Sequence, residues 1–174
     1  CTDCIYDGDI SPGEFYKIGF PPNAIDDYGY SKRLFAEVAS KVNDPNIKII
    51  RASIIGFDKN EVSLLSWFLK HSKHNPNCSG YTNHFWNGIT TLQWARIAAH
   101  VVEYWDKYPN LTVAATEPIS KFDLLNKIAD AFEVKVEINP VAHAKAKNKC
   151  LQSNFPCANI DHQLYDLKTF MENL

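Results

Sequence analysis

Segments typical of β-strands alternate with segments typical of helices along this chain of 174 residues. The clearest strand is the run IKIIRASIIG at residues 47–56, which is rich in β-branched residues and ends at Gly56. Such a run is typical of a buried parallel strand. Helical patterns flank it at residues 27–42 and 62–71. This alternation predicts an α/β fold with a mostly parallel sheet.

The remaining segments follow the same alternation. Residues before Asp7 are predicted to end a strand, and the turn-rich stretch after them, which contains DGDISPGE and PPNAIDD, is predicted to be a loop. Ser and Thr residues that are good N-caps open two of the later helical patterns. We expect further helices within residues 90–105, 120–132 and 161–174, strands at 84–86, 111–116 and 134–138, and a loop through NPNCSG at 75–80.

Composition narrows the class of protein. With 45% hydrophobic and 22% charged residues, the chain has enough apolar material for a core and too little charge for disorder. The net charge of -2 and the scattered lysines leave no basic face, so no nucleic acid partner is expected. No apolar run approaches the roughly 20 residues of a membrane span, and no signal peptide is visible. We expect a cytoplasmic protein without membrane contact, and the start on Cys1 indicates a piece of a longer polypeptide.

The cysteines raise the question of a metal or dithiol site. Cys1 and Cys4 form a Cys-x-x-C motif, but a structural zinc site needs four ligands and no second tight pair follows. His71 and His74 lie in the polar stretch HSKHNPN, which is typical of a solvated helix end. A redox dithiol of this type stands at a helix start within a βαβ unit. We therefore expect no metal site, and reduced, mostly buried cysteines.

Tyr28 and Lys32 form the pair of residues with the most distinctive chemistry. Residues four apart share one face of a helix, so the ammonium group lies close enough to influence the phenol. Roughly one such pair is expected by chance in a chain with this many tyrosines and lysines, so the spacing alone favours an ordinary surface pair. The surrounding sequence decides between these interpretations.

The order of motifs resembles the extended short-chain dehydrogenase/reductase family, most closely its dTDP-4-dehydrorhamnose reductase-like branch. In that branch the catalytic helix reads Tyr-Gly-x-Ser-Lys, the preceding strand ends Ser-Thr-Asp-x-Val-Phe-x-Gly, and the following strand carries Arg-x-Ser. The corresponding stretches here are YGYSK at 28–32, CTDCIYDG at 1–8 and RAS at 51–53. The stretch GYTNHFWNGITTLQWARI also looks like this branch's substrate-binding sequence. The resemblance covers nearly the whole chain.

The resemblance implies a fold, a reaction and a set of residues. The fold would be the C-terminal part of a Rossmann-like doubly wound parallel sheet, at residues 1–57 with the catalytic helix, followed by a small α/β region at 58–174 that mainly binds substrate. The reaction would be NADPH- or NADH-dependent reduction of a 4-keto group on a nucleotide-linked deoxysugar, in surface polysaccharide precursor synthesis. Tyr28 would donate the proton, Lys32 would lower the pKa of Tyr28 and hold the nicotinamide ribose, and Thr2 would hydrogen-bond the substrate oxygen.

The resemblance also implies further cofactor- and substrate-binding residues, for which the support is weaker. Arg51 and Ser53 would line the cofactor or sugar side of the crevice, and a strand-end ion pair and cap explain them equally well. Trp86 fits core packing better than a substrate contact. The substrate-binding set implied by the resemblance is Thr2, Asp3, Cys4, Trp86, Asn87 and Thr90.

The seven glycines do not form the G-x-x-G-x-x-G fingerprint that holds the cofactor pyrophosphate in such enzymes. The chain therefore resembles the C-terminal portion of the enzyme, which we expect to be inactive alone and able to form a homodimer at full length. Two alternatives stay open. One is an epimerase or dehydratase of the same family, although dehydratases place an acidic pair beside the threonine and Cys4 follows Asp3 here. The other is a non-catalytic, reductase-like binding or regulatory subunit.

Overall fold

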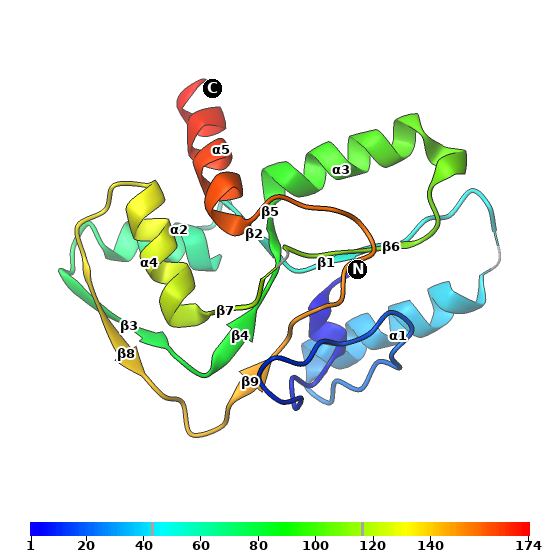
Figure 1. Cartoon of the computed structure of the whole chain (residues 1–174), viewed down its shortest axis with the longest axis horizontal. Helices are drawn as coiled ribbons and strands as arrows, with labels where there is room; N and C mark the ends of the chain where they lie inside the picture. Colours follow the sequence, from blue (N-terminus) through cyan, green and yellow to red (C-terminus); the bar gives the residue numbers. More distant parts are fainter. Residues whose placement is uncertain (43, 116) are drawn as a thin grey trace.

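Five α-helices surround small, mostly parallel sheets in the computed structural model, which describes residues 1–42, 44–115 and 117–174 (Figure 1). Each helix begins after a residue whose side chain accepts a hydrogen bond from the first turn, which is why the sequence patterns locate the helices well. The helices are α1 (Asp27–Lys41), α2 (Leu64–His71), α3 (Thr91–Glu103), α4 (Lys121–Ala131) and α5 (Ile160–Glu172).

The strands are short and pair over long sequence distances. They are β1 (Ile50–Ala52), β2 (Ile54–Ile55), β3 (Asn77–Tyr81), β4 (His84–Trp86), β5 (Ile89–Thr90), β6 (Leu111–Val113), β7 (Ile119–Ser120), β8 (Glu137–Val141) and β9 (Lys147–Asn148). The pairs β1–β6, β2–β5, β3–β8 and β4–β9 are parallel, and β4–β7 is antiparallel. The predicted α/β class with mostly parallel pairing is confirmed.

The strand predicted at residues 47–56 is divided in two. Its first half, β1, pairs with β6, and its second half, β2, pairs with β5, so the strand changes partner at Ser53. In Figure 1 the β1–β6 pair runs between α3 and α1. The expectation of complete burial is wrong for Ile54, which is 56% exposed because its side chain lines a cavity.

The strand predicted to end before Asp7 is also largely replaced. Cys1 alone makes sheet-like hydrogen bonds to β1, through its nitrogen to Ile50 O (2.7 Å) and from Ala52 N to its own oxygen (3.1 Å). The next residues form a 3₁₀ turn, η1 (Asp3–Ile5), because Thr2 caps it. A second 3₁₀ turn, η2 (Trp105–Lys107), follows α3.

Two further predictions differ from the structure. Residues 77–80, expected within the loop at 75–80, belong to β3, and the strand expected at 134–138 begins at Glu137 as β8, the parallel partner of β3. Thr116, the last residue of the strand predicted at 111–116, lies outside the described residues.

The buried apolar residues form separate clusters. One cluster joins α2, α4 and α5 around Leu65, Phe68 and Leu124, and another joins β1, β6 and α3 around Val113 and its neighbours. The proposed division at residue 57 stays a prediction, and β6 from the second region pairs with β1 from the first. Within the described residues, no helix is long and apolar enough to cross a membrane.

Candidate active site

The first turn of α1 presents Tyr28 and Lys32 on one face of the helix. Asp26 caps this helix by accepting a 2.8 Å hydrogen bond from Gly29 N. Lys32 Nζ lies over the ring of Tyr28, 5.4 Å from its centroid. Both side chains line a cavity of about 410 Å³ whose other walls are Cys1, Thr2, Ser31 and Phe35. The structure thus brings the three predicted catalytic residues, Thr2, Tyr28 and Lys32, to one cavity.

Gly29 explains how α1 approaches η1 so closely. A Cβ atom at this position would lie 2.5 Å from Cys4 O and 2.6 Å from Ala24 Cβ. Any larger residue would push the helix away from η1 and move Tyr28 away from Thr2. The glycine next to the tyrosine is therefore required by packing.

The hydroxyl of Thr2 is already engaged at the start of η1. Thr2 Oγ1 accepts a hydrogen bond from Cys4 N (3.1 Å) and donates one to Asp3 Oδ1 (3.0 Å). A hydroxyl has one proton to donate, so it must release Asp3 before it can donate to a substrate oxygen. The predicted contact between Thr2 and a substrate stays a prediction.

The pKa of Tyr28 differs from the sequence-based expectation. Partial burial raises the pKa of this phenol, and the negative charges of Cys4 and Asp3 raise it further. Lys32 Nζ lies over the ring, 5.4 Å from its centroid, and the lowering expected from its charge is not found in this arrangement. The side chain of Tyr28 is 56% exposed.

A second cavity, of about 400 Å³, contains the next two residues of η1, Asp3 and Cys4. Its opposite wall holds Trp86 from β4 and Lys121 from the start of α4, and the Lys121 ammonium lies 5.2 Å from the centroid of the Trp86 ring. Trp86 is nearly buried and donates a 2.6 Å hydrogen bond to Ser53 Oγ. Thr2, the cap of η1, lines the first cavity, and the next two residues line the second, so the two cavities meet neighbouring residues of the chain.

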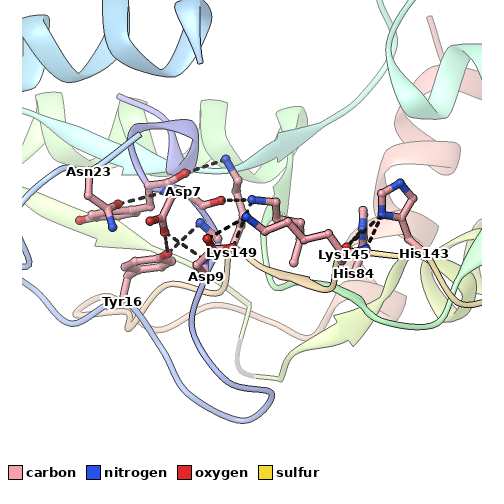
Figure 2. A network of polar contacts seen from close by, with 11 residues as sticks. Asp7, Asp9, Tyr16, Asn23, His84, His143, Lys145 and Lys149 are labelled. Carbon is pink, nitrogen blue, oxygen red and sulfur yellow. Dashed lines mark hydrogen bonds and ion pairs between the residues drawn. The ribbon is translucent and has the colours of Figure 1, made fainter. Parts of the chain in front are cut away.

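Lysines in and around β9 bind the loop that follows η1 through hydrogen bonds and an ion pair. Lys149 Nζ donates to Tyr6 O and Lys147 Nζ to Asp7 O, at 2.7 and 2.6 Å, and Lys145 forms an ion pair with Asp9 (Figure 2).

Within that loop, Tyr16 OH donates to Asp7 Oδ1 (2.7 Å), and Asp7 N donates to Asn23 Oδ1 (3.0 Å). Figure 2 shows this network reaching His84 and His143, whose rings contact Lys145 O. The network holds the residues after η1 against one side of the second cavity.

Other residues predicted for the site have different surroundings. Asn87 is buried and pairs with both main-chain groups of Leu151, so it holds two segments together. Thr90 is buried and caps α3. Arg51 lies near the Tyr6 ring. Its Nε is buried and has no hydrogen-bond partner among the described residues. Asn87 and Thr90 therefore do not line the cavity that contains Trp86, and Ser53 does.

The five cysteines are free thiols in the structure. Cys78 and Cys150 are buried, and the other three are half-buried, so the expectation of mostly buried cysteines fits only in part. Burial, followed by the Asp3 carboxylate, raises the pKa of Cys4, and burial raises the pKa of Cys150 to about 12. High thiol pKa values disfavour the thiolate that a redox centre requires.

Sequence reasoning missed Lys121, Lys147 and Lys149 as cavity residues. Lys121 follows a helix cap, and the other two lie in a lysine-rich stretch with no recognisable motif. Only the folded arrangement brings these lysines together with Asp3 and Trp86.

The chain matches no protein-family model and no curated protein sequence. Among solved structures it is similar to a dTDP-4-dehydrorhamnose reductase from Clostridium acetobutylicum, with a TM-score of 0.81 and 16% identity over 98% of this chain and 64% of that one. A dTDP-4-dehydrorhamnose reductase from Bacillus anthracis in complex with NADP gives a TM-score of 0.80 and 20% identity over 98% of this chain and 63% of that one. A dTDP-glucose 4,6-dehydratase from Bacillus anthracis in complex with NAD gives a TM-score of 0.75 and 13% identity over 99% of this chain and 60% of that one.

These similarities establish the class of fold. The chain has the Rossmann-like α/β fold that these reductase and dehydratase structures share. Within that class its structural neighbours include dTDP-4-dehydrorhamnose reductases, as the motifs around Tyr28 led us to expect. The chain spans about 64% of the length of the first of these structures.

Proposed function

We propose that the protein to which this chain belongs reduces a 4-keto group on a nucleotide-linked deoxysugar, with NADPH or NADH as the hydride donor. The observation that carries the proposal is the convergence of Thr2, Tyr28 and Lys32 on one cavity, in a fold shared with dTDP-4-dehydrorhamnose reductases. The neighbour in complex with NADP supports the choice of cofactor.

The chemistry of the three side chains suits this reaction. Hydride attack on a carbonyl carbon leaves negative charge on the oxygen, and Tyr28 is the acid that protonates it. The hydroxyl of Thr2 donates to the same oxygen after it leaves Asp3. Lys32 would hold the ribose hydroxyls of the nicotinamide nucleotide, and its ammonium close to the phenol would favour the phenolate.

The fit to a nicotinamide cofactor rests on the first cavity. It is open enough to expose 56% of Tyr28, and it carries the ammonium of Lys32 and three hydroxyl groups, those of Thr2, Ser31 and Tyr28, beside the aromatic ring of Phe35. These groups can bind the ribose and cover one face of a nicotinamide ring. The bound cofactor supplies the hydride, and the residues of this chain orient the carbonyl and provide the proton.

A dehydratase is the second candidate, because a dTDP-glucose 4,6-dehydratase shares the fold at a TM-score of 0.75. The side chain after Asp3 weighs against it. Cys4 has a raised pKa, so it is a neutral thiol and not the second acid of an acidic pair. The nucleotide sugar, the homodimer and the role in polysaccharide precursor synthesis belong to the proposal.

The substitution Tyr28→Phe in the full-length protein tests the reaction. It removes one oxygen and keeps the ring, so kcat for a 4-keto nucleotide sugar should fall by about 10²–10⁴-fold while cofactor binding stays near wild type. Tyr30→Phe, two residues along the same helix and outside both cavities, is the matched control and should leave kcat unchanged. Wild-type turnover by Tyr28→Phe would refute the reductase mechanism and favour a non-catalytic binding subunit.

A further inference from the structure

Lys121 is distinguished by an ammonium group that has no partner. It is the first residue of α4, and in the described part of the chain its Nζ makes no hydrogen bond or ion pair. Its nearest neighbour of suitable chemistry is the ring of Trp86, at 5.2 Å. Lys127, on the same helix, instead pairs with Asp161 on the surface at 2.7 Å.

The surroundings do not compensate this charge. Enclosure by protein lowers the pKa of Lys121, although Asp3 and the thiols of Cys4 and Cys150 act in the opposite direction. Asp3 is occupied by Thr2, and no carboxylate comes within ion-pair distance of Lys121 among the described residues. An enclosed ammonium without a partner is costly, so retaining one indicates a group that arrives from outside.

The cavity that contains Lys121 has hydrogen-bond donors to spare. Lys147 and Lys149 line it too. Lys149 donates to one main-chain carbonyl, and Lys147 donates to another and to Asp9 Oδ1 at 3.4 Å, which leaves further N–H groups on both ammonium ions. The carboxylates that line the same cavity already accept hydrogen bonds: Asp3 from Thr2, Asp7 from Tyr16 and Asp26 from Gly29. The complementary ligand group is therefore an acceptor-rich anion that reaches three lysines.

We propose that Lys121 binds the diphosphate of the nucleotide-linked substrate, with Lys147 and Lys149 completing the positive side of the cavity. This inference rests on the proposed function, because a nucleotide sugar places a diphosphate next to the sugar that reacts. The sugar then lies along residues 2–4 toward Tyr28, since Thr2 lines the first cavity and the adjoining Asp3 and Cys4 line the second. Lysine suits a phosphate as a compact point charge with three donors.

Calorimetry on the full-length protein without cofactor tests this assignment. There are three probes. Inorganic pyrophosphate carries the diphosphate alone, dTDP carries the diphosphate together with its nucleoside, and thymidine carries no phosphate. Lys121→Met should weaken pyrophosphate and dTDP binding by roughly 10- to 100-fold, the loss of one charge-assisted hydrogen bond, and leave thymidine unaffected. Lys121→Arg should keep binding within a few-fold, and Lys127→Met should match wild type.

Each outcome decides the point. Unchanged pyrophosphate and dTDP affinity in Lys121→Met, or no diphosphate binding by the wild type, would overturn the inference. Equal losses in Lys127→Met would do the same, because they would reveal only a general charge effect. Lysine-dependent diphosphate binding without reduction of any 4-keto nucleotide sugar would leave this site standing and refute the proposed reaction. If Lys121→Met still reduced the 4-keto nucleotide sugar as well as wild type does, the proposed reaction would stand and the diphosphate site would be refuted.

Discussion

Trp86 Nε1 donates a 2.6 Å hydrogen bond to Ser53 Oγ, and this contact joins β4 to the point where the strand from residue 50 changes partner. Ser53 lies between β1 and β2, and Ile89 N donates to its carbonyl at 2.9 Å. One residue therefore binds an indole through its side chain and β5 through its backbone. Both contacts place Trp86 against the cavity that contains Lys121.

Ser53→Ala should destabilise the fold. It leaves the indole N–H of nearly buried Trp86 without a partner, which costs about 1–3 kcal/mol. Urea unfolding should show the lower midpoint. Trp86→Phe and the double variant complete a mutant cycle, in which Ser53→Ala should cost much less when the indole is already absent. Equal costs of Ser53→Ala in both backgrounds would show that the bond contributes nothing.

Thr2→Val should lower kcat by about 10²-fold if the hydroxyl donates to the transition state. Valine keeps the shape of threonine and removes both hydrogen bonds of Oγ1, to Asp3 and from Cys4 N. Thr2→Ser restores the hydroxyl and should keep kcat within a few-fold of wild type. Circular dichroism and thermal melting separate loss of the η1 cap from loss of chemistry. Equal activity of the valine and serine variants would contradict a role for the hydroxyl.

Lys32→Met should reduce kcat and cofactor affinity together, because one ammonium serves both the phenol and the ribose. Where Lys32 approaches the phenol in the cofactor complex, loss of its charge should raise the pKa of Tyr28, already raised by burial, still further, so the alkaline limit of activity should move to higher pH. Fluorescence titration with NADPH and a pH–rate profile measure the two effects. Lys41→Met, in the last turn of the same helix, is the control and should change neither. A fall in kcat with unchanged cofactor affinity would exclude the ribose contact.

The sequence was sufficient to predict features that depend on local chemistry. The helix that carries Tyr28 was predicted at 27–42 and found at Asp27–Lys41, because its cap and its apolar spacing are both local. Its glycine was part of the recognised motif, and the structure adds the reason, contact with Cys4 O.

Features that depend on distant contacts were not predictable in the same way. The stretch NPNCSG resembles a loop, yet residues 77–81 form β3 because β8 supplies the hydrogen bonds about 60 residues later. Gly80 serves close packing there, since a Cβ would lie 2.6 Å from Phe122 Cα. Lys121 was overlooked for the same reason, because its importance comes from Trp86 and Asp3, which are distant in the sequence.

Lys121→Met should stabilise the protein while it weakens diphosphate binding. The folded state lowers the pKa of this ammonium below the value of 10.5 expected in the unfolded chain, so its charged form opposes folding. This penalty is complete below the folded-state pKa and disappears as the pH rises toward 10.5. The Tm of Lys121→Met should therefore exceed that of wild type near pH 7, and the difference should shrink in alkaline buffer. Lys127→Met removes an exposed ion pair on the same helix and should shift Tm little at either pH. A Tm for Lys121→Met below wild type, by the same amount at both pH values, would show that Lys121 contributes packing and not an uncompensated charge.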